Sequence, residues 1–184
     1  PGVLNAMRVQ EPYKLASRIG HPSGSQIEIQ AGGGIGPIRF GGDEVIVMAG
    51  PCSVESRQQI IESAIALKEA GAKVLRGGAF KPRTSPYDFQ GHGAACLPFV
   101  FELAGKYAIR VIAMEITAEP QIDEIRRALQ ISGQPTGVML QIGTRNTQNF
   151  ELLKIVGRQT EMPILLKRGF GITLDESLNA AEYL

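Results

Sequence analysis

Positively charged side chains follow the short apolar runs of this sequence, at positions where strands would end. The five residues concerned are Arg76, Lys81, Arg83, Arg145 and Lys167. The whole chain is nearly neutral, with a formal net charge of +1, so this grouping is local. One such lysine could equally be a solvated strand end, but the set favours an anion site, where each charge-assisted hydrogen bond contributes about 1.5–3 kcal/mol. We expect the ligand to be phosphate or carboxylate, because arginine binds either group through two hydrogen bonds.

A cysteine, Cys52, follows the first apolar run. A lone cysteine in that place is ordinarily a small buried apolar residue, and as a metal ligand it would need partners. The two histidines, His21 and His92, have no recognisable ligand spacing to it. The residues therefore suggest a metal site without establishing one. Cys96 falls within an apolar helical stripe, and we expect it in the core.

The apolar runs are the elements that must position these residues. They occupy residues 45–49, 72–75, 109–114, 138–142 and 164–166, and the third run leads into Glu115. They are rich in β-branched residues and nearly continuous, which is typical of parallel strands buried on both faces. Amphipathic stretches separate them, so the sequence predicts an α/β fold of five βα units. In an open doubly wound sheet and in a closed barrel alike, ligands bind at the carboxyl ends of the strands.

Helix caps and core stripes support this division. Ser56 and Gln59 fit a capping box, and Gly71 stands where a helix would end. Thr173 and Glu176 fit a second capping box. The apolar stripes of the helices are expected in the core: Ile60, Ile61, Ala64, Ile65 and Leu67; Leu97, Val100, Phe101 and Ala104; Ile122, Ile125 and Leu129; Phe150, Leu153 and Val156, closed by Gly157; Leu178, Ala181 and Leu184.

The N-terminal region differs from the rest of the chain. Residues 26–30 and 38–40 alternate between apolar and polar types, and a glycine cluster at 32–36 separates them, which predicts a β-hairpin. These glycines lack the G-x-G-x-x-G spacing of a dinucleotide site, so we interpret them as a turn. We divide the chain into an extension with a hairpin, residues 1–43, and a partial barrel domain, residues 44–184.

Composition excludes several classes of protein. The chain has 184 residues, of which 43% are hydrophobic and 20% charged, as in an ordinary globular domain. Nineteen basic and eighteen acidic residues give no bulk charge for binding nucleic acid or a membrane. Two cysteines make no disulfide framework, so we expect a cytoplasmic protein without a signal peptide. Since the first residue is Pro1, we expect a piece of a longer protein.

Four segments together resemble one enzyme family. They are AGPCSVES at residues 49–56, LRGGAFKPRTSPY at 75–87, LQIGTRN at 140–146 and LLKRG at 165–169. They are similar to the type I beta branch of the 3-deoxy-D-arabino-heptulosonate 7-phosphate (DAHP) synthases, and the similarity extends from about Tyr13 to the last residue. The KPRT segment is highly specific, because the related 3-deoxy-octulosonate 8-phosphate synthases carry a different one.

The resemblance implies a (β/α)8 TIM barrel that condenses phosphoenolpyruvate with erythrose 4-phosphate and releases phosphate, the first step of the shikimate pathway. It assigns phosphoenolpyruvate to Arg76, Lys81, Arg145 and Lys167. It assigns the phosphate of erythrose 4-phosphate to Arg83 and Thr84. Lys81 and Glu115 would be catalytic, with Glu115 orienting the water or the intermediate. Cys52 would bind a divalent metal ion of the Mn, Fe, Zn or Co type.

Two features depart from the family pattern. The remaining metal ligands of the family are a His, a Glu and an Asp on later strands, and we expect them beyond residue 184. A full barrel takes about 250 residues, so we expect this chain alone to bind metal weakly, to lack synthase activity and to be poorly soluble or oligomeric. In the third unit, residues 113–117 replace a more usual threonine–glutamate pattern. The longer protein is expected to be a homo-oligomer.

Two other functions remain open from the sequence. The chain could be a non-catalytic phosphate-binding or regulatory module that keeps the cations. It could also be a different phosphosugar aldolase that forms a Schiff base, for which Lys167 beside Arg168 is the candidate. A serine nucleophile is disfavoured, since Ser53 and Ser85 have no histidine near them at a strand end.

Overall fold

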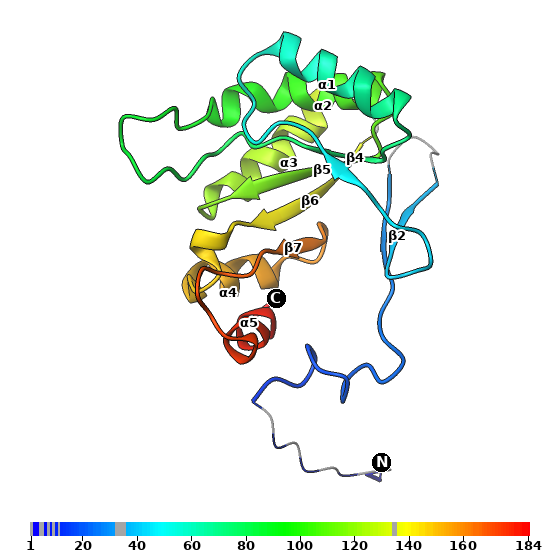
Figure 1. The fold of residues 1–184 in the computed structure, drawn as a ribbon, viewed down its shortest axis with the longest axis vertical. Helices are drawn as coiled ribbons and strands as arrows, with labels where there is room; N and C mark the ends of the chain where they lie inside the picture. Colours follow the sequence, from blue (N-terminus) through cyan, green and yellow to red (C-terminus); the bar gives the residue numbers. More distant parts are fainter. Residues whose placement is uncertain are drawn as a thin grey trace.

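The computed structural model describes residues 12–31, 36–133 and 136–184, together with residues 2, 3, 6, 8 and 10. Its centre is a five-stranded parallel sheet whose strands follow one another in chain order (Figure 1). The strands are β3 (Met48–Ala49), β4 (Val74–Arg76), β5 (Val111–Ile116), β6 (Gly137–Ile142) and β7 (Ile164–Leu166). Every expected strand is present beside its neighbour in sequence, which confirms the predicted α/β fold.

A helix follows each strand of the sheet. The helices are α1 (Arg57–Glu69), α2 (Leu97–Lys106), α3 (Pro120–Ser132), α4 (Phe150–Arg158) and α5 (Leu174–Ala181), and short 3₁₀ helices span Gly93–Cys96 and Thr144–Asn146. α1, α2 and α3 lie side by side over one face of the sheet (Figure 1). This face holds the main hydrophobic core, to which α4 and α5 also contribute.

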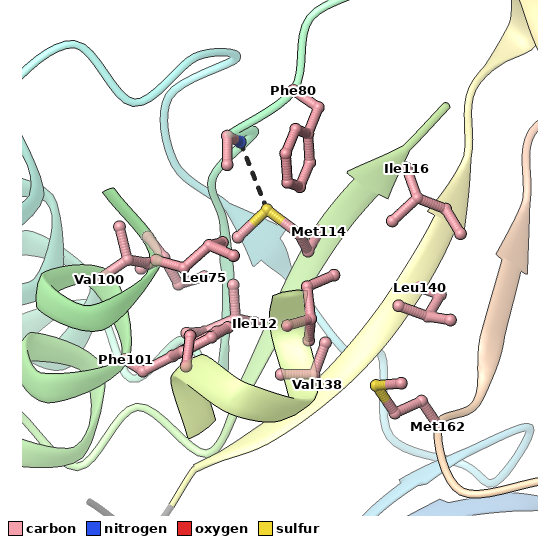
Figure 2. Close-up of a cluster of buried hydrophobic side chains, with 14 of the residues drawn as sticks. Leu75, Phe80, Val100, Phe101, Ile112, Met114, Ile116, Val138, Leu140 and Met162 are labelled. Carbon is pink, nitrogen blue, oxygen red and sulfur yellow. Dashed lines mark hydrogen bonds between the residues drawn. The ribbon is translucent and has the colours of Figure 1, made fainter. Parts of the chain in front are cut away.

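The centre of that core lies between α2 and the middle strands. Ile112 of β5 and Leu140 of β6 belong to one buried cluster with Val100 and Phe101 of α2 (Figure 2). Full burial of each such side chain contributes about 1.5–3 kcal/mol. The sulfur of Met114 accepts a hydrogen bond of 3.3 Å from the backbone N–H of Ala79, just after β4. This contact fixes the start of the segment that carries Lys81.

The opposite face of the sheet packs against an N-terminal hairpin. We call this face of the sheet the hairpin face. Strands β1 (Ile27–Ile29) and β2 (Ile38–Phe40) pair antiparallel, which confirms the predicted hairpin. One buried isoleucine from each hairpin strand belongs to a second cluster with residues of the sheet strands: Ile29, Ile38, Val74, Val111, Ala113 and Met139. Residues 32–35 of the expected glycine turn lie outside the described residues.

The carboxyl end of the hairpin face is polar. Arg76 lies opposite Ala113 across β4 and β5, so it shares the face of Ala113. Glu115 lies two residues further along β5 and points to the same face, because side chains alternate along a strand. Gln141 of β6 lies opposite Glu115. The apolar end of this face therefore contacts the hairpin, and the polar end lies where ligands bind in parallel α/β folds.

The first strand is shorter than the sequence suggests. Residues 45–49 were expected as a strand, but β3 contains only Met48 and Ala49. Val45 and Val47 are exposed, by 86% and 56%. In the part of the chain that is described, β3 pairs with β4 alone, so residues 45–47 have no ladder partner to hold them extended.

Two helix boundaries also differ from expectation. Ser56 caps α1 as predicted, but the side chain of Gln59 accepts from the N–H of Glu55 rather than Ser56, so the capping box is incomplete. Gly157 lies inside α4, where a Cβ would overlap with the carbonyl oxygen of Tyr183. Close packing of the chain end, rather than helix termination, explains that glycine.

The other caps and most of the stripes are confirmed. Gly71 follows the last residues of α1 with φ of +71°. Thr173 and Glu176 make both hydrogen bonds of a capping box. Phe150 departs from the core stripe of α4 and Ile65 from that of α1, being 41% and 39% exposed. Cys96 is buried as expected, and burial raises its pKa to about 11.

The N-terminal segment lies against the last helix. The Tyr13 hydroxyl donates to Asp175 at 3.0 Å, and the backbone N–H groups of Leu15 and Ala16 donate to the Glu182 carboxylate at 3.0 Å. These bonds connect the two ends of the chain. No helix in the described ranges has both the length and the apolar character that crossing a bilayer requires.

Candidate functional site

Lys81 lies at the centre of a cluster of charged and thiol groups. It is only 8% exposed, and its Nζ donates to Oε2 of Glu115 at 3.2 Å, which is also 8% exposed. The same Nζ lies 3.4 Å from Sγ of Cys52. Nη2 of Arg76 approaches that sulfur to 3.2 Å. Four side chains predicted from the sequence as site residues therefore meet at one point.

Three strands and their loops supply this cluster. Arg76 is the last residue of β4, and Glu115 lies near the end of β5. Cys52 follows β3 by three residues, as expected for a residue at the end of the first strand. The neighbouring loop contains a glycine, Gly78, where a Cβ would come within 2.8 Å of the Cys52 carbonyl oxygen and 3.0 Å of Lys81 Cδ. Only a residue without a side chain lets Lys81 fold back over this turn.

Both oxygens of the Glu115 carboxylate have close neighbours. One oxygen accepts from Lys81, and a Cβ on Gly143 would overlap with the other, Oε1. Gly143 directly follows β6 and starts the 3₁₀ helix that carries Arg145. The absence of a side chain at 143 thus makes room for the carboxylate of the neighbouring strand.

A second group of predicted residues lies at the same edge of the sheet. Nη2 of Arg145 donates to Oγ1 of Thr84 at 3.2 Å, which joins the loop after β6 to the loop after β4. Nε of Arg83 donates to the carbonyl oxygen of Phe89 at 3.1 Å. This contact with the backbone fixes the Arg83 side chain through Nε, and the two Nη groups take no part in it.

Lys167 follows β7 at that edge. Its N–H continues the ladder to Ile142 O at 3.0 Å, and its carbonyl accepts from Thr147 Oγ1 at 2.6 Å. The lysine is exposed. A Schiff-base lysine needs an apolar pocket to lower its pKa, and this exposure does not supply one.

The cluster carries excess positive charge. Arg76 and Lys81 contribute two positive charges, whereas Glu115, which pairs with Lys81, contributes one negative charge. Burial raises the pKa of the Cys52 thiol, but the hydrogen bond and charge of Lys81 and the nearby charge of Arg76 outweigh burial and hold that pKa below its ordinary value. The same field that favours a thiolate favours a bound anion such as phosphate.

The donor set fits one ligand of a metal site. The thiolate character of Cys52 suits a divalent metal ion. Among the residues that the structure describes, no three His, Cys, Asp or Glu side chains are grouped so that they could hold a metal ion. The contacts of Sγ with Arg76 and Lys81 are contacts with cations. Cys52 can therefore supply one ligand, and a complete site needs further ligands beside it.

Sequence reasoning assigned no role in the site to three residues near the cluster. Gln141 is 4% exposed and lies opposite Glu115, and its polar type at alternating spacing in an apolar strand was the available signal. Gly143 gave no signal, because its role depends on contact with another strand. Ser53 is 3% exposed, and its hydroxyl has no hydrogen-bond partner among the described residues.

Known proteins share this sequence and fold. Residues 24–184 match the DAHP synthetase I family. The phospho-2-dehydro-3-deoxyheptonate aldolase of Thermotoga maritima is 43% identical over 182 residues, which are 99% of this chain and 49% of that protein. A 2-dehydro-3-deoxyphosphooctonate aldolase of Bradyrhizobium diazoefficiens is 34% identical over 105 residues, 53% of this chain and 37% of that protein.

Solved structures agree with the sequence matches. The crystal structure of the Thermotoga maritima aldolase, a DAHP synthase, superimposes with a TM-score of 0.77 at 41% identity, covering 96% of this chain and 46% of that one. A truncated form of the Thermotoga maritima synthase gives a TM-score of 0.72 at 37% identity, covering 93% and 56%. The chain spans about half the length of the Thermotoga maritima relative, which is 49% covered. Its parallel sheet and hairpin are part of a TIM-barrel fold, and the chain belongs to the DAHP synthetase I family.

Proposed function

We propose that this chain forms the phosphate-binding part of a DAHP synthase active site. The reaction is the condensation of phosphoenolpyruvate with erythrose 4-phosphate, with release of phosphate. The observation that carries the proposal is the convergence of Arg76, Lys81 and Glu115 on the polar end of the hairpin face, in a chain of this family. The cations neutralise two phosphorylated substrates that would otherwise repel each other.

Each group has a role in this proposal. Phosphoenolpyruvate is held through its phosphate and carboxylate by four cations: Arg76, Lys81, Arg145 and Lys167. Arg83 and Thr84 hold the phosphate of the aldehyde substrate. The methylene carbon of phosphoenolpyruvate then forms a bond to the aldehyde carbon, whose oxygen takes a proton. Water adds at the second carbon of phosphoenolpyruvate, and the C–O bond to phosphate breaks.

Two side chains stand at the reacting carbons in this proposal. Lys81 is the cation that contacts both Glu115 and Cys52, so it is suited to hold an anionic oxygen and to move a proton. Glu115 orients the attacking water or the intermediate. A divalent metal ion, when bound, would polarise the aldehyde carbonyl, with Cys52 as one of its ligands.

The proposal also assigns parts of the chain to different tasks. Residues 44–184 supply the substrate-binding side chains named above, and residues 1–43 supply the hairpin that covers the apolar end of the hairpin face. A cytoplasmic location and a homo-oligomeric longer protein belong to the same proposal. They rest on the family resemblance.

Calorimetric titration of the chain with phosphoenolpyruvate tests this function. We expect binding that Arg76→Ala weakens by at least about tenfold, because a charge-assisted hydrogen bond contributes about 1.5–3 kcal/mol. The control is Lys154→Ala, which removes an exposed cation that pairs with Glu151 on α4. Absence of binding to the unchanged chain, or an equal effect of both substitutions, would contradict the proposal. Binding without turnover by the longer protein would favour the non-catalytic phosphate-binding module instead.

A further inference from the structure

The loop between β4 and α2 carries two of the proposed substrate-binding residues, Arg83 and Thr84. It extends well beyond the end of the sheet (Figure 1). Most of it is exposed, and the Tyr87 side chain is 96% exposed. A loop of this length has many conformations available. Something must therefore hold Arg83 and Thr84 in place for them to bind a phosphate group with useful affinity.

Backbone bonds close the base of this loop. The N–H of Lys81 donates to Gln90 O at 3.0 Å, and the N–H of Gly93 donates to Ala79 O at 3.0 Å. Gly91 adopts φ of +88°, and a Cβ there would overlap with the same Ala79 oxygen. These contacts fix where the loop begins and ends. They leave the position of its arginine undetermined.

His92 connects the loop to a different part of the site. Its Nε2 lies 2.9 Å from the carbonyl oxygen of Glu55. Because a carbonyl only accepts, this bond requires a proton on Nε2. The imidazole ring also meets the ring of Phe89 edge-on, with centroids 4.9 Å apart and planes at 69°. The carbonyl of Phe89 holds Nε of Arg83 at 3.1 Å. A continuous path of contacts therefore runs from Glu55 to Arg83.

The other end of this path is itself fixed. Glu55 lies in the loop after β3, three residues from Cys52, and immediately precedes the cap of α1. Its N–H donates to Gln59 Oε1 at 2.9 Å. The N–H of Val54 donates to Gly78 O at 3.0 Å. His92 thus fastens the extended loop to a segment that is anchored to both a helix and the turn before Lys81.

We propose that His92 is a positioning residue that holds Arg83 and Thr84 in place for the phosphate group of the aldehyde substrate. It acts through Phe89 and Glu55 and does not itself touch the substrate. This proposal rests on the proposed function for the identity of the ligand. We call the path of contacts from Glu55 through His92 and Phe89 to Arg83 the latch. The latch is a property of the fold that can be measured without any ligand.

Limited proteolysis measures the latch directly. We expect trypsin to cleave after Arg83 mainly when the loop opens, because the side chain of Arg83 is bonded to the carbonyl oxygen of Phe89. His92→Leu removes the hydrogen bond and the aromatic contact, and we expect cleavage after Arg83 to accelerate about fivefold, the effect of one neutral hydrogen bond on a local opening equilibrium. His92→Gln can still donate to Glu55, so its cleavage rate is expected to stay nearer to that of the unchanged chain. His21→Leu is the matched control, because His21 is exposed and far along the sequence from this loop.

Ligand binding then separates positioning from simple stability. Erythrose 4-phosphate and phosphoenolpyruvate are titrated separately. His92→Leu is expected to weaken the binding of erythrose 4-phosphate about fivefold and to leave the affinity for phosphoenolpyruvate within about twofold of that of the unchanged chain. His92→Gln is expected to recover most of the lost affinity. A merely structural role would weaken both ligands alike.

Two outcomes would overturn the latch: unchanged cleavage after Arg83 in His92→Leu, and an equal acceleration in His21→Leu. Equal weakening of both ligands would overturn the positioning role of His92. If the unchanged chain binds neither ligand while His92→Leu still accelerates cleavage, the proposed function fails. In that case the latch holds as a feature of the loop, and the substrate part of this proposal is wrong.

Discussion

The thiol of Cys52 shows how strongly individual neighbours govern chemistry in this site. It is exposed to solvent, yet two cations lie within 3.4 Å of its sulfur. Cys96, the other cysteine, is buried in the main hydrophobic core. Two residues of the same type in one chain therefore have pKa values displaced in opposite directions. The cause is their surroundings alone.

Alkylation by iodoacetamide tests this difference. Since the thiolate is the nucleophile and the pKa of Cys52 is lowered, its reaction rate is expected to rise with pH at a lower midpoint than that of a free thiol. Lys81→Met removes one of the two cations that lower this pKa, so the midpoint is expected to move to higher pH. Mass spectrometry of the two cysteine peptides gives the rates, with buried Cys96, of pKa about 11, as the internal control. Equal profiles for the unchanged chain and Lys81→Met would contradict the argument.

A second prediction at the scale of single residues concerns Gly143 and the stability of the fold. Gly143→Ala places a methyl group on Oε1 of Glu115 and is expected to push the carboxylate away from Lys81. Overpacking of this kind costs about 1–3 kcal/mol of the free energy of unfolding. Gly42→Ala is the control, since its Cβ would have only one atom at 4.0 Å, and it is expected to change stability by less than about 0.5 kcal/mol. Urea unfolding compares the two, and equal midpoints would show that Glu115 moves without cost.

At the scale of elements, the sheet has two differently covered faces. Helices cover one face, and the hairpin covers the apolar end of the other. Strand alternation sends successive side chains to these two faces, so the same strand supplies the core and the site. β5 is the clearest case, because Ile112 and Met114 lie in the helix-side core while Ala113 and Glu115 point to the hairpin face. The hairpin is thus part of the hydrophobic core rather than an appendage.

Two isoleucines of the hairpin test this role. Ile38 is 1% exposed against the sheet, whereas Ile27 on the neighbouring strand is 52% exposed. Ile38→Ala is expected to lower the free energy of unfolding by about 2–5 kcal/mol, as is typical when a fully buried isoleucine is truncated. Ile27→Ala removes the same atoms and is expected to cost less than about 1 kcal/mol, because most of them are already in solvent. Equal losses in chemical denaturation would mean that the hairpin does not pack on the sheet in solution.

At the scale of the whole molecule, the two outer strands of the sheet are expected to govern how the chain associates with other chains. Within the described ranges, β3 pairs only with β4 and β7 only with β6, so each has one unpaired edge. Beside β3, a cleft of about 440 Å³ is lined by the exposed Val45 and Val47 and by residues of α1. Unpaired strand edges next to apolar surface promote pairing with other chains.

We therefore predict that this chain, purified alone, is oligomeric or poorly soluble. Light scattering after size exclusion measures the association, and charged substitutions at Val45 and Val47 are expected to reduce it, because charge on an edge opposes strand pairing. A charged substitution at Val3 is the control, because Val3 is 84% exposed and lies far along the chain from the strands of the sheet. A monodisperse monomer with a cooperative melt would contradict this prediction.

The same chain is expected to show no synthase activity by itself. Mixing it with phosphoenolpyruvate, erythrose 4-phosphate and Mn²⁺, and following the loss of phosphoenolpyruvate, is the direct assay. Turnover at an ordinary enzyme rate, about 1–10³ s⁻¹, would show that Cys52 and the cations suffice without further metal ligands. The longer protein is expected to be active in the same assay.

The sequence by itself determined where the strands lie along the chain and which residue types stand at their ends. Apolar runs and caps such as Thr173 are local signals, so five βα units and the hairpin could be predicted from them. The motif around Lys81 and Arg83 also identified the family before any contact was known. The short β3 was mispredicted, because strand length depends on a ladder partner and not on the apolar run at 45–49.

Only the tertiary structure decided how the candidate residues meet. The pairing of Lys81 with Glu115 and the room that Gly143 leaves for that carboxylate join residues far apart in sequence. The bond from His92 to Glu55 likewise spans 37 positions, and the sequence offered no role for that histidine, since it lacks a ligand spacing to Cys52. The physical reason is that sheet register and loop closure bring these groups together, and neither leaves a mark in the local pattern of residue types.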